Sequence, residues 1–394
     1  MIRYLTGGES HGKGLIAIIE GLPANLFIDL EKVNAALAKR QMGYGRGNRM
    51  TIERDRVEIL SGVRGSYTIG SPVTLFVENR DWQNWKEIMD PVQNISRKSV
   101  TLPRPGHVDL AGGIKYGHYD LRNVLERASA RETAVRTAVG AVAGLLLMNL
   151  SIELFSYVVS IGKVRINPAL LPPQTIGSSS LKRLARIAAT DQNLLNMPDV
   201  SASRRAAKAI ENAKKNGNTL GGIFEIRACN VPVGLGSYSQ WDRKLDGRLA
   251  GALMSIQAVK GVEIGNGMSN AERYGSEVHD EIFHSAKKGF YRKTNRAGGI
   301  EGGVSNGEEI ILRAYMKPIS TLYRPLHSVD VSSKSPGRAA VERSDICAVP
   351  AASVVGEAVT AIELANAVVE KFGGDTMDDL KHTYAAYRSR IENY

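Results

Sequence analysis

Two histidines lie in loops that glycine and proline make stiff. His11 belongs to the run 6–14 (TGGESHGKG), and His107 belongs to the run 102–109 (LPRPGHVD). An imidazole in a rigid loop can donate or accept a proton near neutral pH. Arg104, three residues before His107, adds a cation suited to a phosphate that is protonated as it leaves. A structural role for either histidine stays open at this point.

Arginines gather near glycines and histidines in four parts of the chain. Arginine binds carboxylate and phosphate through paired hydrogen bonds, and glycines let backbone N–H groups approach the same anion. A single arginine is more often solvated or paired with an acid, but the repetition favours a small polyanionic ligand. We expect Arg127 and Arg131 to share one helix face, because they are four residues apart. The four groups are Arg40, Arg46 and Arg49; Arg104; Arg127 and Arg131; and Arg338 and Arg343.

The chain carries a clear excess of positive charge. Its 394 residues include 51 Lys and Arg against 40 Asp and Glu, which gives +11. Nucleic-acid binders usually show basic runs with interleaved aromatic residues, whereas aromatic residues make up only 6% here. Residues 7–13 fit the phosphate-loop pattern GxxxxGK, but Gly14 stands where a Mg²⁺-binding hydroxyl is needed. A nucleotide enzyme and a nucleic-acid binder therefore remain alternatives to an enzyme for a small polyanion.

The chain lacks the marks of a membrane or secreted protein. Its longest apolar run, 138–148, is shorter than the ~18–20 residues of a spanning helix. Arg3 is followed by a glycine-rich segment and not by an apolar leader. Cys229 and Cys347 could form at most one disulfide, and no CxxC pair is present. We expect a cytoplasmic protein.

Strand and helix patterns alternate along the chain without a linker, so we expect one domain spanning 1–394. We expect residues 79–106 to form a long segment on the surface. Residues 265–308 are glycine-rich and too long for a simple connection, so we expect a functional loop there. The expected strands are 15–20, 73–78, 151–162, 221–231 and 310–316. The expected helices are 29–40, 123–147, 178–192, 203–216, 242–259 and 353–372.

Taken together, these segments resemble the chorismate synthase family. Any one motif is modestly specific, but their order and spacing cover more than 330 residues. Val108 departs from the family, which commonly has Ala at this position. The motifs are 3–12 (RYLTGGESHG), 104–107 (RPGH), 129–133 (SARET), 254–263 (MSIQAVKGVE) and 342–350 (ERSDICAVP).

The resemblance implies a fold and a reaction. The fold is α/β (α+β), with helices sandwiched between β-sheets and no Rossmann unit, and the enzyme is a homotetramer. The reaction is a 1,4-anti elimination of phosphate from 5-enolpyruvylshikimate 3-phosphate, which gives chorismate and closes the common shikimate pathway to the aromatic amino acids. It requires reduced FMN without net redox change, because the flavin lends an electron to the substrate and recovers it. An external flavin reductase is the expected source of reduced flavin, with NADPH as the alternative reductant.

The resemblance also assigns residues. His11 would keep the reduced flavin protonated, His107 would protonate the departing phosphate, and Asp345 would help flavin N5 to remove the C6 proton. The flavin would be held by Arg127, Ala128, Ser129, Gln257, Ala258, Gly302, Lys317, Pro318, Ile319, Ser320, Thr321 and Arg343. The substrate or NADPH would be bound by Arg40, Arg46, Arg49, Arg104, Arg131, and Lys13 or Arg338.

Overall fold

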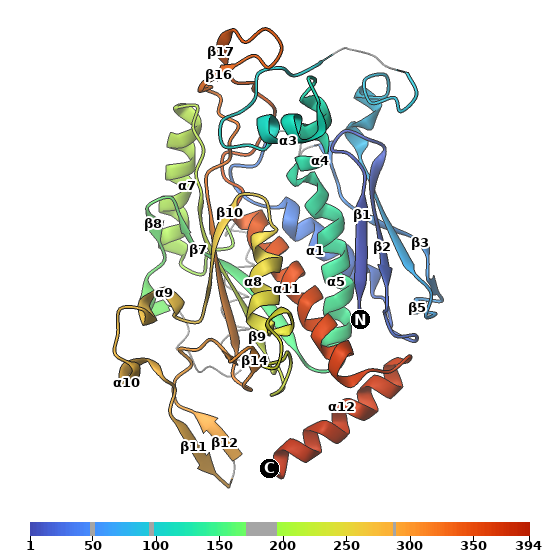
Figure 1. The fold of residues 1–394 in the computed structure, drawn as a ribbon, viewed down its shortest axis with the longest axis vertical. Coiled ribbons are helices and arrows are strands. Elements are labelled where there is room, and N and C mark those ends of the chain that lie inside the picture. Colours follow the sequence, from blue (N-terminus) through green and yellow to red (C-terminus); the bar gives the residue numbers. More distant parts are fainter. Residues whose placement is uncertain (48–51, 94–97, 171–194, 287–288) are drawn as a thin grey trace.

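Two antiparallel sheets enclose a layer of helices (Figure 1). The computed structural model describes residues 1–47, 52–93, 98–170, 195–286 and 289–394. The first sheet has the order β1-β2-β6-β3, with β1 at Arg3–Gly7, β2 at Gly14–Glu20, β6 at Val73–Glu78 and β3 at Val57–Ser61. The second has the order β10-β15-β9-β7-β8, with β10 at Val259–Ile264, β15 at Ile310–Met316, β9 at Gly222–Cys229, β7 at Glu153–Ile161 and β8 at Val164–Arg165.

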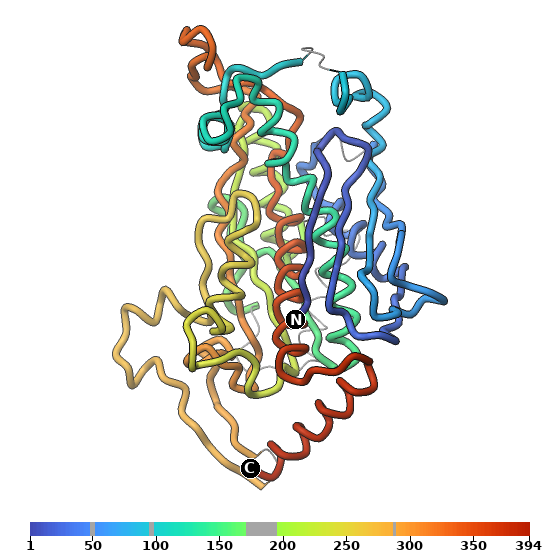
Figure 2. Tube along the Cα trace, turned by 45° about the vertical axis from the view of Figure 1, so that its right-hand side comes forward, coloured from blue at the N-terminus to red at the C-terminus, as the bar shows by residue number. Residues whose placement is uncertain are grey.

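Two long helices form the centre of the sandwich. Helices α5 (Thr133–Asn149) and α11 (Val349–Phe372) run side by side in the same direction (Figure 1). They approach closely at Gly140, where an added Cβ would lie 2.4 Å from the Cβ of Ala358. The turned view in Figure 2 places the N-terminal sheet on one side of this pair and the later strands on the other. The expected sandwich of helices between sheets is therefore confirmed.

Helix α11 is long and apolar enough to cross a membrane. However, 83% of its most apolar window is buried inside the molecule, between α5 and the strands β7 and β9. Helices α1 (Leu30–Gln41) and α8 (Leu245–Met254) also pack on it. It is the central helix of the core, and the same core includes residues of both sheets.

The remaining elements are short or peripheral. They are β4 (Val63–Arg64), β5 (Tyr67–Thr68), η1 (Arg80–Asn84), α3 (Asp109–Tyr116), α4 (Arg122–Ala128), η2 (Ala130–Glu132), η3 (Pro168–Leu170), α7 (Val200–Lys215), η4 (Trp241–Arg243), α9 (Gly267–Asn270), α10 (Gly275–Val278), β11 (Ile282–Ser285), β12 (Gly289–Arg292), β13 (Ile300–Glu301), β14 (Val304–Ser305), β16 (His327–Val329), β17 (Pro336–Arg338) and α12 (Met377–Glu392).

The five expected strands are confirmed, and so are the helices expected at 29–40, 203–216 and 353–372, with small shifts at their ends. Asp29 caps the first of these helices, since its side chain accepts a hydrogen bond from the backbone N–H of Lys32. The helix expected at 178–192 lies outside the described residues.

The single helix expected over 123–147 is wrong. Ser129 has an extended backbone (φ −63°, ψ 139°) that separates α4 from η2 and α5. Its hydroxyl accepts from the backbone N–H of Arg131, a local bond with which serine competes against helix continuation. Arg127 and Arg131 therefore do not share a helix face.

Three further expectations differ from the structure. The helix expected over 242–259 ends at Met254, and β-branched residues continue the chain as β10. The described residues of the expected loop 265–308 form two short helices and two antiparallel strand pairs, of which β11–β12 extends away from the body (Figure 1). The expected surface excursion 79–106 contributes buried side chains, among them Asp81, Trp85 and Arg104.

Candidate active site

Most of the expected site residues that the structure describes gather where α5 and α11 begin. Thr133, the first residue of α5, accepts a 3.2 Å hydrogen bond from Nε of Arg40. Near the start of α11, the backbone N–H of Ile346 donates to the carbonyl of Gly45 over 2.9 Å. The loops around His11, His107 and Lys317 meet at the same end of the helix pair, as the contacts below show.

His11 is held between a carboxylate and an aromatic ring. Its backbone N–H donates to Oε2 of Glu126, and its Nδ1 lies 2.8 Å from Oε1 of the same side chain. The ring of Trp85 stacks on the imidazole at 3.9 Å. Burial disfavours the ionised form of Glu126, but the hydrogen bonds from His11 and the charge of Arg122 outweigh it and hold the pKa of Glu126 below its usual value.

His107 and Arg104 both bind Asp109. Arg104 donates to this carboxylate through its backbone N (3.0 Å), Nε (2.8 Å) and Nη2 (3.1 Å), and through Nη1 to Thr321 Oγ1 (2.8 Å). Nδ1 of His107 lies 2.5 Å from Oδ1 of Asp109. Because an ionised carboxylate only accepts, the contact with Asp109 places the ring proton on Nδ1. Nη2 of Arg104 lies 3.0 Å from Nδ1 and 3.4 Å from Nε2 of the same ring.

The charge of Asp109 is stabilised by these partners. Burial opposes its ionisation, but the hydrogen bonds from His107 and Arg104 are stronger and hold the pKa of Asp109 well below its usual value. Asp109 also begins α3, where the helix dipole favours a negative charge.

Asp345 is anchored on both oxygens. Oδ2 lies 2.7 Å from Nη1 of Arg46, and Oδ1 accepts from the backbone N–H of Gly47 over 2.7 Å. An added Cβ at Gly47 would lie 2.9 Å from the carbonyl of Ser344, so this close approach requires glycine. The structure thus brings together two segments that are far apart in the chain, since the Gly47–Asp345 separation is 298 residues.

Arg131 and Arg40 share Asp55. Arg131 contacts Asp55 through Nη1 (2.6 Å), Glu53 through Nη2 (3.6 Å) and Asn79 through Nε (2.8 Å). Nη1 of Arg40 lies 3.5 Å from Oδ2 of Asp55. Burial lowers the pKa of Arg40 to about 10, the attraction of Asp55 opposes this, and the charge of Arg131 adds to it. Both guanidinium groups are therefore buried in an internal ion network.

Most residues expected to hold the flavin lie beside these histidine loops. Lys317 Nζ and Ser320 Oγ both donate to the carbonyl of Gly106, and the backbone N–H of Lys317 donates to the carbonyl of Ala258 over 2.9 Å. Oε1 of Gln257 is buried without a hydrogen-bond partner among the described residues. Pro318, Ile319 and Thr321 continue the Lys317 segment.

A further part of the expected flavin set lies beside His11. Arg127 donates to Thr6 Oγ1 over 2.7 Å and to the carbonyl of Gly8 over 3.1 Å. Ser129 Oγ accepts from Ser10 Oγ over 3.1 Å, and Ala128 precedes it at the end of α4. Arg343 forms an ion pair with Asp81.

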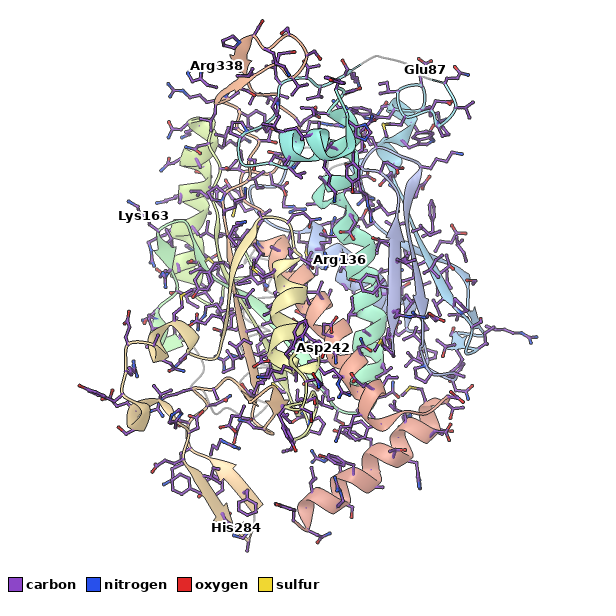
Figure 3. The ribbon with its side chains drawn as sticks, in the orientation of Figure 1. Glu87, Arg136, Lys163, Asp242, His284 and Arg338 are labelled. Atoms are coloured by element: carbon purple, nitrogen blue, oxygen red, sulfur yellow. The ribbon has the colours of Figure 1, made fainter. Side chains whose placement is uncertain are left out.

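Two expected residues lie apart from the others. Gly302 lies in the β13–β14 turn, a short way before the start of β15, whereas Lys317 follows the end of that strand. The seven residues of β15 separate these positions by roughly 20 Å at about 3.4 Å per residue. Arg338 is exposed at the β16–β17 hairpin (Figure 3) and contacts the carbonyl of Pro325. Arg49 lies outside the described residues.

Several residues of this site were not expected from the sequence. Asp109 was visible two residues after His107, and its carboxylate could have been recognised as a partner. Glu126 and Trp85 have no such local signal, because they meet His11 only in the folded chain. Arg136 of α5, in the middle of the helix layer (Figure 3), contacts Ser255 Oγ at 2.6 Å just before Gln257.

Comparisons with known proteins cover the whole chain. The family model described as chorismate synthase matches residues 2–369. The chain is 58% identical over 393 residues to a chorismate synthase of Desulforudis audaxviator, which covers 99% of this chain and 98% of the relative. It is 56% identical to the chorismate synthase of Geobacter sulfurreducens over the full length of both. A crystal structure of chorismate synthase matches with a TM-score of 0.81 and 44% identity, covering 100% of this chain and 99% of the other.

Proposed function

The chain belongs to the chorismate synthase family, and on that premise we propose how its residues carry out the family's reaction. The enzyme is a carbon–oxygen lyase that removes phosphate from 5-enolpyruvylshikimate 3-phosphate by 1,4-anti elimination and yields chorismate for aromatic amino-acid biosynthesis. The assignment of residues rests above all on one observation, the Arg104–His107 pair held on the buried carboxylate of Asp109.

Reduced FMN is the proposed cofactor, and the residues fit it. Oε1 of Gln257 is a buried acceptor that lacks a donor among the described residues, and a flavin ring offers N–H donors. Ala258 beside it has φ +68°, and its carbonyl accepts from Lys317. The group would be held by these residues with Arg127, Ser129, Ser320 and Arg343, and when bound it supplies an electron that the substrate takes up and returns.

His107 acts on the leaving phosphate. Its Nδ1–H is fixed by Asp109, so Nε2 is the atom that delivers a proton to a phosphate oxygen. Arg104 lies against the same imidazole, with Nη2 3.0 Å from Nδ1, and its charge would stabilise the phosphate as negative charge develops. A single loop thus supplies both the proton and the positive charge for the leaving phosphate.

Asp345 and Arg46 act on the substrate carbon skeleton. Oδ1 and Oδ2 of Asp345 each have a fixed donor, which would orient the carboxylate to assist the bound flavin when the C6 proton is removed. Arg46 and the buried Arg40 provide the positive charge that two substrate carboxylates require. His11 acts as an acid. The proton on its Nε2 would keep the reduced flavin protonated.

The test is a single anaerobic experiment. Purified protein is mixed with FMN, the flavin is reduced, and 5-enolpyruvylshikimate 3-phosphate is added while phosphate and the flavin absorption spectrum are recorded. We expect one phosphate per substrate, a transient change in the flavin spectrum and no net flavin oxidation. Phosphate release at the same rate without flavin would contradict the cofactor assignment.

Further properties of the whole enzyme belong to the same proposal. A homotetramer would allow Gly302 of one copy to reach the flavin of another, since Gly302 and Lys317 lie at opposite ends of β15. A single domain 1–394 agrees with one hydrophobic core that includes both sheets. Two buried free cysteines suit the reducing cytoplasm. An external reductase, or NADPH directly, would supply the electrons for FMN.

A further inference from the structure

Glu126 fixes His11 in two ways at once. Its side chain is 3% exposed, with Oε2 accepting from the backbone N–H of His11 and Oε1 lying 2.8 Å from Nδ1. The carbonyl of Glu126 also accepts from the backbone N–H of Ser10 over 2.9 Å. Trp85 sets the plane of the imidazole by stacking at 24°, and Glu126 sets the rotation of the ring within that plane.

The carboxylate also determines where the imidazole carries its proton. An ionised carboxylate has no N–H or O–H to donate, so Nδ1 must be the protonated nitrogen when it contacts Oε1. Nε2 is then the nitrogen that exchanges a proton with a ligand. A neutral ring in the opposite tautomer would present N–H at Nε2 and a lone pair at Nδ1, and it would place that lone pair against the carboxylate.

The charges around Glu126 keep it ionised. Nη1 of Arg122 lies 3.6 Å from Oε1, and Nη2 of the same arginine lies 2.8 Å from Oε1 of Glu342. Lys98 lies over the aromatic ring of this cluster, with Nζ 4.0 Å from the centroid of Trp85. On the His11 loop itself the neighbouring acid is Glu9.

We propose that Glu126 is the positioning residue of His11, holding its imidazole with the proton on Nδ1 so that Nε2 performs the proton transfer. This inference rests on the proposed role of His11 as an acid. It predicts that turnover depends on the negative charge of the Glu126 side chain and not only on its size. A neutral amide in the same place has one acceptor oxygen, which can accept from only one of the two N–H groups of His11. The NH₂ group of glutamine would donate to Nδ1 and move the ring proton to Nε2.

The test compares Glu126→Gln with a matched control, Glu342→Gln. Both substitutions remove one carboxylate from Arg122, but only the first touches His11. Turnover of 5-enolpyruvylshikimate 3-phosphate with reduced FMN is measured as phosphate release from pH 6 to pH 9. We expect Glu126→Gln to lose about 10–100-fold in kcat, with KM changed by less than about threefold.

The pH profile separates positioning from a structural effect. The proposed role of His11 requires its imidazole to be protonated. Loss of the neighbouring negative charge should therefore move the alkaline limb of the pH–rate profile to lower pH by about one unit. Glu342→Gln should keep the parental limb. Glu126→Asp keeps the charge with a shorter side chain, so it should keep the limb as well while losing part of kcat.

Three results would overturn the inference, and they are distinguishable. A parental pH profile in Glu126→Gln, in the same assay where His11→Ala has lost turnover, would show that the carboxylate does not act through His11. Parental turnover in His11→Ala would instead remove His11 from the reaction and the inference with it. A shifted limb in Glu126→Asp would also contradict it, since the charge is retained.

Discussion

Each of the two histidines is backed by a buried carboxylate at Nδ1, but the two carboxylates are neutralised differently. Asp109 receives three N–H groups of Arg104. Glu126 has its nearest arginine nitrogen, on Arg122, at 3.6 Å. The charge of Asp109 is therefore shared between Arg104 and His107, whereas Glu126 contacts His11 more closely than Arg122.

Replacement of His107 should stop turnover and leave cofactor binding intact. We expect His107→Ala to lose about 10²–10⁴-fold in kcat, the range that general acid catalysis contributes. His118→Ala is the matched control, because His118 follows the end of α3 and takes no part in the hydrogen bonds among Arg104, His107 and Asp109.

The measurements for this pair are phosphate release and a fluorescence titration of FMN. FMN affinity should stay within about twofold, because His107 donates nothing to the proposed flavin set. Parental turnover in His107→Ala would remove it as the acid, and equal losses in both variants would point to a general disturbance of the loop.

The sequence could predict the histidines but not all their partners. The glycines and prolines around His11 and His107 are their neighbours in the sequence, so they can be recognised without knowledge of the fold. Glu126 meets His11 across 115 residues, and Asp55 meets Arg131 across 76. Such pairings depend on how α4 and the first sheet pack in the folded chain. The sequence therefore could not show that carboxylates of the chain neutralise the arginines expected to bind ligands.

At the level of elements, the break at Ser129 has the largest effect on the site. A continuous helix over 123–147 would have placed Arg127 and Arg131 on one face. The extended Ser129 instead directs Arg127 to Thr6 and Gly8, and Arg131 to Asp55. Helix propensity and apolar periodicity do not report such a break, because the serine that makes it is also tolerated inside helices.

The contact between α5 and α11 should depend on one glycine. In Gly140→Ala the new Cβ would lie 2.4 Å from the Cβ of Ala358, so the helices must separate. We expect a loss of about 1–3 kcal/mol in the free energy of unfolding. Gly144→Ala is the control in the same helix, because no atom of the described part of the chain lies within 4 Å of its added Cβ, and it should gain about 0.5–1 kcal/mol. Chemical denaturation of both variants measures this, and equal effects would contradict the close contact.

Glu309, the residue just before β15 of the second sheet, should make the free energy of unfolding depend on pH. Burial raises the pKa of Glu309 to about 7, and Arg227, with Nη1 3.3 Å from Oε2, opposes this. The folded-state pKa lies above the unfolded value, so this contribution to stability is present at low pH and is lost as the pH rises through about 7.

The variant Glu309→Gln cannot ionise and should therefore differ from the parent mainly at high pH. We expect it to be more stable than the parent at pH 8 by about 1–3 kcal/mol, and close to it at pH 5. Glu301→Gln, at a side chain that is 42% exposed, is the control and should show no such trend. Denaturation at the two pH values measures the difference, and a gap that is equal at both would refute the assignment.

For the whole molecule, the net charge of +11 does not translate directly into a positive pocket. Arg40, Arg46, Arg104 and Arg131 are each paired with a carboxylate of the chain. The substrate brings one phosphate and two carboxylates, so its binding must compete with these internal pairs or add to them. The site is therefore better described as a network of internal ion pairs that an anionic substrate joins than as a simple excess of cations.

The position of Gly302 allows the proposed homotetramer to be tested through the activity of the site. If Gly302 serves the flavin of another copy, a chain defective at Gly302 and a chain defective at Lys317 should complement each other. Gly302→Trp is suitable because, among the described residues of its own chain, no atom lies within 4 Å of the added Cβ. Gly302→Asn controls for the strain of its φ of +60° and should stay active, since Asn tolerates that region.

Each of Gly302→Trp and Lys317→Ala should be inactive alone. Co-expressed in equal amounts, they should form mixed oligomers in which about one quarter of the sites combine an intact Lys317 with an intact Gly302 from a neighbour. Phosphate release should return to about that fraction of the parental rate. Co-expression of Gly302→Trp with the double variant should restore nothing, because no neighbour then carries an intact Gly302. If the first mixture also stays inactive while its oligomers form, Gly302 does not reach the flavin across an interface, and the roughly 20 Å along β15 would exclude it from the site of its own chain as well.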